Sequence, residues 1–380
     1  MANSIDRRDF FKLAGSAAVV AGAASIAPTA IANTVTNSCA PKVDPTKRIH
    51  VTTEYGKLNE IFVGRAPHAD DLFIEWNEKS VTNMKPWLKP ETAKVMEVNS
   101  GKRWEDALGK DVLDQATAEI DGLAKTLEDL GVTVHRPPRV TGEDAKYLST
   151  GIDQIFPRDV FCTVGNTTVV SSLRMDFKRK QQYTFTSFYK DIMKNGQGKF
   201  FSTPQATMDI FAGDKKRVEQ ANEDAICLDG GDFVVDGENI YLGIGKGSNM
   251  NGYEFVKSMF GDEYIVTPFI LDKKSLHLDC ALSILSPNLA LICREWIKSE
   301  LPESLSHYTF IDVTPEEAAW LGCNGLPVSP DTVIMDPHHA RIVAEVRKHG
   351  HNVIEQPFQV ASMLGGALRC ATQPINRDDV

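Results

Sequence analysis

Phe161-Cys162-Thr163-Val164-Gly165-Asn166-Thr167-Thr168-Val169-Val170-Ser171 is the stretch that decides the fold. Its two ends, 161–164 and 168–171, are rich in the β-branched and aromatic residues that are typical of short strands. Gly165-Asn166 between them tolerates the positive φ angles that a tight hairpin turn requires. The stretch therefore predicts a β-hairpin.

The same pattern recurs along the chain. Further strand pairs surround turns of Gly, Asn, Asp, Ser or Pro, at 233–235 with 239–242, 281–285 with 289–293, and 326–328 with 332–335. Helical periodicity is found between and beside these pairs, at 112–130, 188–194, 252–259, 315–321 and 337–348. Strand pairs that alternate with helices at nearly even intervals predict an α/β protein of repeated ββα-type modules around a common axis.

The composition is that of an ordinary globular enzyme. The chain has 380 residues, of which 42% are hydrophobic and 24% charged. Its net charge of −10 disfavours a nucleic-acid partner, because a phosphate backbone is bound by clustered Lys and Arg. No segment after the N-terminus is apolar for long enough to span a bilayer. We expect a single domain over residues 51–380, after a flexible polar lead-in at 33–50.

Residues 1–32 are typical of a twin-arginine (Tat) signal peptide. The run Arg7–Lys12 contains the two arginines, an Ala-rich apolar stretch follows it, and Ala30-Ile31-Ala32 offers a cleavage pattern. The alternative is an N-terminal membrane helix, which the short, glycine-interrupted apolar stretch and Pro28 disfavour. We therefore expect export to the periplasm.

The cysteines do not form a disulfide or zinc pattern. Seven are present, without any CxxC pair or regular spacing. We expect most of them to be small buried hydrophobic residues. Cys370 is the exception.

Four segments carry the residues suited to chemistry. They are 156–159, 228–232, 277–279 and 365–370, and they supply three carboxylate stations, one imidazole and one thiol. Opposed carboxylates can accept the N–H groups of a planar guanidinium, and a thiolate can attack its carbon from above the plane. An imidazole beside the thiol could protonate the departing amine.

Each residue alone has a simpler structural interpretation. Asp159 could cap a turn, the run 229–232 could be a surface turn, His277 could be a satisfied structural histidine and Cys370 could be a buried small residue. Asp279 shares a face with His277 only if the segment is extended. The joint occurrence of all four segments, with their glycines, favours the chemical interpretation.

The whole chain after the predicted signal peptide resembles the amidinotransferase branch of the guanidine-modifying enzymes. The resemblance begins at 58–66 and 130–137, and is strongest at 149–151 with Pro157-Arg158-Asp159 and at Gly165-Asn166. Lys190-Asp191-Ile192, Pro204 and Thr207-Met208 are similar to arginine:glycine amidinotransferase in particular. The resemblance implies the five-bladed α/β propeller, or pentein fold, of pseudo-repeated ββαβ modules.

The resemblance also implies roles, position by position. Cys370 matches the nucleophile, His277 the general acid/base and Asp229 the carboxylate that orients it. The remaining matches are to substrate-binding positions, with Asp159 and Asp279 as guanidinium clamps and with supporting roles for the others: Arg158, Asp232, Asn249 and Arg294.

The implied function is amidino transfer from a guanidino donor to an amine acceptor through an amidino-cysteine, by ping-pong kinetics and without metal or organic cofactor. The alternatives are a guanidine hydrolase or deiminase, and a periplasmic binding protein that has lost the reaction. A homo-oligomer is compatible with the sequence.

Three positions depart from the family pattern. Arg369 precedes Cys370, as in deiminases, where the mammalian-type amidinotransferases carry His. Gly247-Ser248 precede Asn249, and the carboxylate-binding arginine falls at Trp296, so that Arg294 would have to replace it. Two other signals are interpreted as surface features: the basic run 177–180, and His338-His339 with Asp336.

Overall fold

The computed structural model describes residues 41–73, 90–140, 154–174, 176–205 and 214–380. These residues form five small sheets of three strands each, which confirms the predicted α/β propeller of five modules. The predicted signal peptide, the 149–151 segment and Thr207-Met208 lie outside the described residues.

The stretch quoted above forms the first complete module along the chain. β3 (Phe161–Val164) and β4 (Thr167–Val170) pair antiparallel, and Gly165 has the positive φ (54°) expected of the turn. After helix α9 (Thr186–Asn195), β5 (Lys199–Ser202) pairs parallel to β4. The helix crossover supplies the length that a parallel pairing requires.

Three more modules repeat this order of hairpin, crossover and parallel third strand. Their strands are β6 (Phe233–Asp236), β7 (Asn239–Ile244) and β8 (Ile265–Ile270); β9 (Leu282–Ser286), β10 (Leu289–Ile292) and β11 (Thr309–Asp312); β12 (Leu326–Ser329), β13 (Thr332–Met335) and β14 (Asn352–Glu355). The crossovers of the first and last of these modules contain α11 (Met250–Phe260) and α13 (Ala340–Lys348). The crossover from β10 to β11 has only short 3₁₀ turns, and α12 (Pro315–Ala319) follows β11. The predicted hairpins and helices are therefore confirmed, with ends shifted by a few residues.

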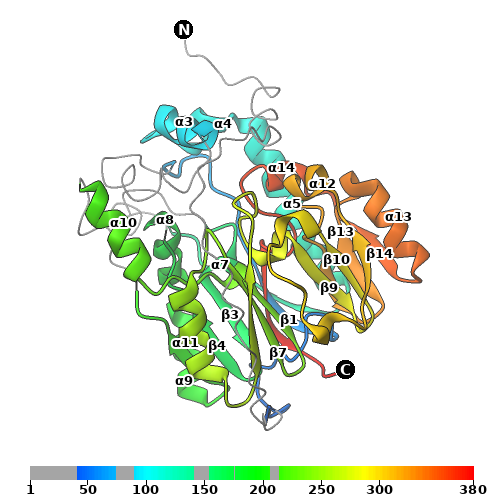
Figure 1. The fold of residues 1–380 in the computed structure, drawn as a ribbon. Helices are drawn as coiled ribbons and strands as arrows, with labels where there is room; N and C mark the ends of the chain where they lie inside the picture. The colour runs from blue at the N-terminus through cyan, green and yellow to red at the C-terminus, as the bar shows by residue number, and fades with distance from the viewer. Residues whose placement is uncertain (1–40, 74–89, 141–153, 175, 206–213) are drawn as a thin grey trace.

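The two ends of the chain close the fifth module. β1 (Leu58–Val63) pairs antiparallel with β15 (Thr372–Arg377) and parallel with β2 (Thr133–His135). Figure 1 shows the blue and red strands side by side. Helix α5 (Lys110–Asp129) is the crossover, and α14 (Gln359–Ser362) packs against it. This sheet joins segments that local sequence patterns could not pair.

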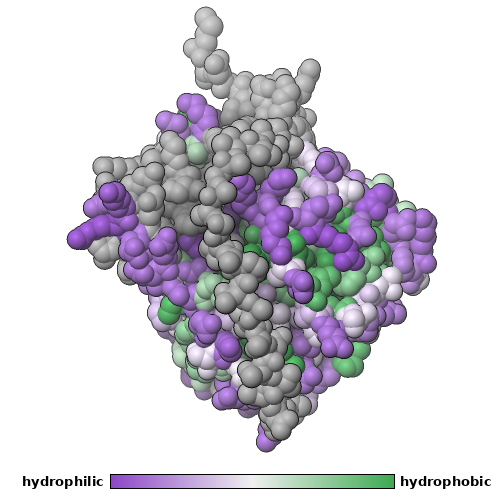
Figure 2. Space-filling view, in the orientation of Figure 1, coloured by the Kyte–Doolittle hydropathy of each residue, from purple (hydrophilic) through white to green (hydrophobic). Residues whose placement is uncertain are grey.

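Amphipathic helices cover the outside of the modules. In α13 the side chains of Ile342, Val343 and Val346 are buried, and Figure 2 shows a hydrophilic outer surface over this helix. Burial of such an apolar stripe holds a surface helix to its sheet. Just before three of the hairpins, the short elements α7 (Pro157–Val160), η4 (Gly230–Asp232) and η5 (Leu278–Cys280) lie in contact, α7 with η4 and η4 with η5, in the region of the candidate site.

The remaining described elements are short or peripheral. The helices are α3 (Pro90–Asn99), α4 (Trp104–Leu108), α7 (Pro157–Val160), α8 (Asp176–Arg179) and α10 (Lys215–Asp224). The 3₁₀ turns are η2 (Lys180–Phe185), η4 (Gly230–Asp232), η5 (Leu278–Cys280), η6 (Arg294–Trp296), η7 (Glu303–Leu305) and η8 (Pro337–His339). Across these described ranges, no helix combines the length and apolarity needed to cross a membrane.

The expected lead-in at 33–50 is wrong at its C-terminal end. Ile49 is completely buried, and the backbone N–H of His50 donates to the carbonyl of Ile375 in β15. Asn166, in the first hairpin turn, also donates to the carbonyls of Asp44 and Ile49. The folded domain therefore includes residues just before 51, because they cap the edge of two modules.

Candidate active site

One asparagine side chain from another segment holds the backbone around Cys370. Cys370 is almost completely buried just before β15. The Oδ1 atom of Asn324 accepts hydrogen bonds from the backbone N–H groups of Arg369 (3.0 Å) and Cys370 (3.1 Å), and its Nδ2 donates to the carbonyl of Asp279 (3.3 Å). Asn324 thus connects the backbone of Cys370, the candidate nucleophile, to the backbone of Asp279, which is predicted to bind the guanidinium. Nothing in the sequence predicts this role of Asn324, because a single Asn in a loop carries no pattern.

Asp279 lies between the thiol of Cys370 and an arginine of the chain itself. The Sγ atom of Cys370 is 3.5 Å from Asp279 Oδ2, and the Nη1 atom of Arg369 is 2.9 Å from the same oxygen. Arg369 also pairs with Glu54 (3.0 Å) and donates to the carbonyl of Phe233 (2.8 Å). All of these charged groups are buried. Arg369 is therefore part of the site, where it balances two carboxylates.

Burial lowers the pKa of Arg369, but the charges of Glu54 and Asp279 outweigh this effect, so that its pKa lies above the ordinary value. For the neighbouring Arg158, the nearby carboxylates do not outweigh the effect of burial on the pKa. Burial and the repulsion of Arg369 lower the pKa of Arg158 to about 10, and its Nε donates to the carbonyl of Arg369 (3.4 Å). The expected substrate-binding role of Arg158 thus stays a prediction, and its described contacts are with the Cys370 segment.

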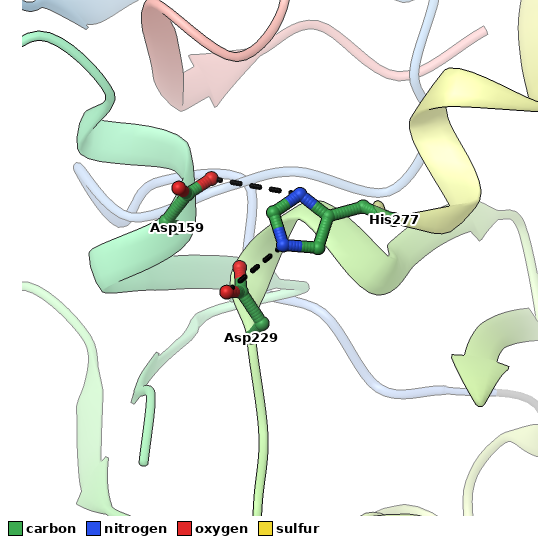
Figure 3. A group of neighbouring side chains, drawn as sticks. All are labelled: Asp159, Asp229 and His277. Carbon is green, nitrogen blue, oxygen red and sulfur yellow. Dashed lines mark ion pairs between the residues drawn. The ribbon is translucent and has the colours of Figure 1, made fainter. Parts of the chain in front are cut away.

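His277 lies between two carboxylates from other modules (Figure 3). Its Nε2 is 2.9 Å from Asp229 Oδ2, and its Nδ1 is 3.8 Å from Asp159 Oδ1. Asp229 immediately precedes η4, Asp159 belongs to α7, and His277 immediately precedes η5. Three segments that are far apart in the sequence therefore bring their predicted residues together.

The charges around His277 determine its protonation. Burial lowers the pKa of His277, but Asp229 and Asp159 outweigh it, and the pKa lies well above its usual value. Burial raises the pKa of Asp229, but the attraction of His277 dominates, and that pKa lies below its usual value. These opposite shifts of the two pKa values favour an imidazolium paired with the Asp229 carboxylate, which is the form that can donate a proton.

Lys178 corrects the interpretation of the basic run 177–180 as a solvated surface. Its side chain is buried, and its ammonium group forms an ion pair with Asp159 Oδ2. Burial raises the pKa of Asp159 to about 6, and the charge of Lys178 opposes this rise. A cation of the chain thus occupies one oxygen of a carboxylate that was predicted to bind a cationic substrate.

Two of the predicted substrate-binding residues support the backbone of the site. Asp232 accepts hydrogen bonds from the N–H groups of Leu278 (3.0 Å) and Ser248 (2.8 Å), and burial raises its pKa to about 7. Asn249 caps α11 by accepting from Gly252 N (2.9 Å), and it also accepts from Cys227 N (3.1 Å). These two residues hold the loops that carry His277 and Asp229.

Arg294 is not part of this cluster. Its side chain is half exposed, its Nε is 2.8 Å from Asp312 Oδ1, and its guanidinium lies over the ring of Phe310. The expectation that Arg294 replaces the family's carboxylate-binding arginine therefore stays a prediction, and the described contacts of Arg294 are with β11. Its position in η6 directs it to a neighbouring strand instead.

Close backbone packing explains one glycine of the site. A Cβ atom on Gly231 would lie 2.4 Å from His277 Nδ1 and 2.8 Å from its Cγ. Since no real side chain tolerates such distances, this position requires glycine. Gly231 therefore allows η4 to pack directly against the imidazole.

The same three side chains form a set of atoms that could hold a small cation. One atom from each of Asp159, Asp229 and His277 lies within 4.8 Å of the other two. Both ring nitrogens of His277 face carboxylates, so a protonated imidazole already accounts for this grouping of charges.

The described cysteines are all free and buried: Cys162, Cys227, Cys280, Cys293, Cys323 and Cys370. This agrees with the expectation of small buried residues, and it leaves the thiol of Cys370 available as a nucleophile.

Comparison with known proteins identifies the family of this chain. A model of N,N-dimethylarginine dimethylhydrolase, eukaryotic, matches residues 89–377. Inosamine-phosphate amidinotransferase 1 of Streptomyces griseus is 26% identical over 285 residues, which cover 70% of this chain and 82% of that protein. Mitochondrial glycine amidinotransferase of Gallus gallus is 24% identical over 355 residues, covering 85% of this chain and 82% of the relative.

A solved structure of inosamine-phosphate amidinotransferase from Streptomyces griseus has the same fold, with a TM-score of 0.68 and 21% identity over 88% of this chain and 98% of that one. The chain belongs to the N,N-dimethylarginine dimethylhydrolase family and is an enzyme of the amidinotransferase branch of the pentein superfamily.

Proposed function

We propose that this enzyme transfers an amidino group from a guanidino donor to an amine acceptor through a covalent intermediate on Cys370. The observation that supports this most is the convergence of a thiol, Asp279 and the His277–Asp229 ion pair from three segments of the chain. A thiol nucleophile with an adjacent acid and base is the arrangement that covalent group transfer requires.

In the first half-reaction the Cys370 thiolate attacks the guanidinium carbon, and a C–S bond forms. The tetrahedral species collapses when the C–N bond to the donor amine breaks, and His277 gives that amine its proton. The pKa of His277, which its carboxylates raise well above the usual value, provides this proton at neutral pH. The products are the free amine and an amidino-thioether on Cys370.

In the second half-reaction the neutral His277 takes a proton from the acceptor amine. The amine nitrogen attacks the amidino carbon, the C–S bond breaks, and the Cys370 thiolate is restored. Asp229 stabilises the imidazolium that forms again, at 2.9 Å from its Nε2. Asp159 and Asp279 remain the proposed contacts of the planar guanidinium, and Lys178 would have to share or release Asp159.

A hydrolase is the second candidate function. Arg369 before Cys370 favours it, as does the hydrolase after which the matching family model is named. In that case water replaces the acceptor amine, and ureido or urea-type products leave together with ammonia or an amine.

Product analysis separates these functions. Arginine, agmatine and guanidinoacetate are each incubated with the enzyme, with and without added amines. A transferase gives a new guanidino product only with the acceptor, whereas a hydrolase gives ammonia, urea-type or ureido products without it. Intact mass after incubation with donor alone should show the amidino adduct on Cys370. No adduct and no turnover with any compound would instead favour a binding protein.

The matched variants are Cys370→Ala and Cys227→Ala. Both thiols are buried and free, but Cys227 packs against Ala221 and Ala225, outside the site. Cys370→Ala should abolish turnover and the adduct, and Cys227→Ala should retain both. Full activity of Cys370→Ala would refute the mechanism.

We also propose that the protein is exported by the Tat pathway to the periplasm, on the strength of Arg7-Arg8 and the Ala-rich stretch that follows. Cell fractionation of the full chain tests this. Arg7→Lys with Arg8→Lys should leave the protein in the cytoplasm, and an unchanged distribution would contradict the proposal.

A further inference from the structure

A second thiol lies beside the candidate nucleophile and has no part in the proposed reaction. Cys280 belongs to η5, directly after Asp279, and is as completely buried as Cys370. Its Sγ is 3.4 Å from Asp279 Oδ1, while Cys370 Sγ is 3.5 Å from Asp279 Oδ2. The two thiols therefore contact the two oxygens of a single carboxylate.

Cys370 also influences the ionisation of Cys280. The Cys370 thiol, burial and the charge of Asp279, in that order, raise the pKa of Cys280 well above its usual value. The other described cysteines have different neighbours; Cys162, for example, lies in β3 and Cys323 lies near Cys293. Cys280 and Cys370 thus form a specific pair, although 90 residues separate them in the sequence.

We infer that Cys280 is a resolving cysteine: oxidation of Cys370 by a peroxide leads to a Cys280–Cys370 disulfide that reversibly stops the reaction. This inference rests on the proposed function, in which Cys370 is the nucleophile. It adds an oxidative modification site that controls that nucleophile.

The chemistry takes place in two balanced steps. The Cys370 thiolate attacks one oxygen of hydrogen peroxide, an S–O bond forms, the O–O bond breaks and hydroxide leaves. The sulfur is oxidised to a sulfenic acid by two electrons, and the peroxide is reduced. Cys280 sulfur then attacks Cys370 sulfur, the S–O bond breaks, and the departing hydroxide takes the Cys280 proton as water. A dithiol reductant then reduces the Cys280–Cys370 disulfide and restores both thiols.

The environment sets the order of these steps. Only a thiolate reacts readily with peroxide, and the raised pKa of Cys280 keeps that thiol protonated. In the proposed function Cys370 is the sulfur that reacts as a thiolate, so it is the one oxidised first, and Cys280 is the thiol that condenses with the product. The disulfide would remove both sulfur contacts to Asp279 and would protect Cys370 from irreversible oxidation to the sulfinic acid.

Peroxide treatment of the full chain tests the inference. Wild-type enzyme should lose two hydrogen atoms in mass, and peptide mapping without reductant should join the peptides that contain Cys280 and Cys370. Activity should fall in parallel with this cross-link and should return with dithiothreitol. Absence of the cross-link after complete inactivation would overturn the inference, whatever the variants show.

The matched variants are Cys280→Ser and Cys227→Ser. Treated Cys280→Ser should lack the cross-link, should gain two or three oxygen atoms on Cys370, and should not recover with dithiothreitol. Treated Cys227→Ser should behave as the wild type does. Equal recovery of Cys280→Ser and the wild type would also contradict the inference.

The same measurements distinguish failure of the proposed function from failure of the resolving role of Cys280. If the cross-link forms while activity is retained, Cys370 is not the nucleophile, and the proposed function fails. If alkylation of Cys370 abolishes activity but peroxide never joins it to Cys280, the proposed function stands and the resolving role fails.

Discussion

The guanidinium of Arg369 lies 2.9 Å from the carboxylate of Asp279, on the oxygen that also contacts the Cys370 thiol. A residue that marks a departure from the amidinotransferase pattern is thus an internal counterion of the site. Since Glu54 binds the other side of this guanidinium at 3.0 Å, removal of Arg369 would leave two buried carboxylates without their common partner.

We therefore predict that Arg369→Met destabilises the protein by about 3–5 kcal/mol, because breaking a buried ion pair leaves uncompensated charge. Arg294→Met is the matched control, since its pair with Asp312 is largely exposed and should contribute about 0–1 kcal/mol. Denaturant unfolding of both variants measures the difference. Equal unfolding midpoints would show that the Arg369 network does not stabilise the fold.

The pH dependence of His277 provides the second prediction. Its folded pKa is raised above the unfolded value of about 6.5, so its charge stabilises the fold fully below that pH. This stability is lost as the pH rises through the folded pKa. Asp229→Asn removes the nearest carboxylate and should move the alkaline limb of kcat/KM to lower pH. Asp312→Asn, at an exposed ion pair, should leave that limb in place; an identical shift in both variants would contradict the assignment.

The third prediction concerns the contact of Gly231 with the imidazole. Gly231→Ala would place a methyl group 2.4 Å from His277 Nδ1, so the ring must move. A displacement of about 1 Å at a catalytic group costs roughly 10²-fold in rate, and we expect a fall of that size in kcat.

The control for this variant is Gly237→Ala in the β6–β7 turn. Gly237 has a positive φ of 59° and open space around its Cα, so alanine there should lower stability without reaching the site. Similar kcat values for the two variants would argue that Gly231 is only a structural glycine.

The fourth prediction concerns Lys178. Its charge opposes the effect of burial on Asp159, whose pKa is about 6. Lys178→Met should raise this pKa further and move the acid limb of kcat/KM to higher pH, whereas Lys178→Arg should largely preserve the profile. Lys190→Met, on the outer helix α9, is the control. An unchanged acid limb in Lys178→Met would show that the ionisation of Asp159 does not limit the reaction.

Local patterns in the sequence were sufficient for much of the fold. The hairpin around Gly165-Asn166 and the helix at 340–348 depend on residues close together in the chain, through turn conformation and a repeated apolar face. The resemblance to a known family then indicated which acids, imidazole and thiol would meet. The structure brings Asp229 and His277 together as predicted.

Other features could not be predicted from local patterns. The sheet of β1 and β15 joins residues more than 300 positions apart, and nothing near Leu58 specifies Arg377 as its partner. From the sequence, Lys178 was expected on a solvated basic surface and Arg294 at the substrate site. Only packing decided that one is buried against Asp159 and that the other remains at the surface with Asp312.

The sequence by itself determined the module, its repetition and the residue types available for chemistry, because these depend on periodicity and turn geometry within a few residues. Tertiary structure alone decided the charge and contacts of the site: the counterion role of Arg369, the hydrogen bonds of Asn324 to the Cys370 backbone, and the contacts of Cys280 and Cys370 with one carboxylate. The physical reason is that burial and the field of distant neighbours set these properties, and both exist only after the five modules have assembled around one centre.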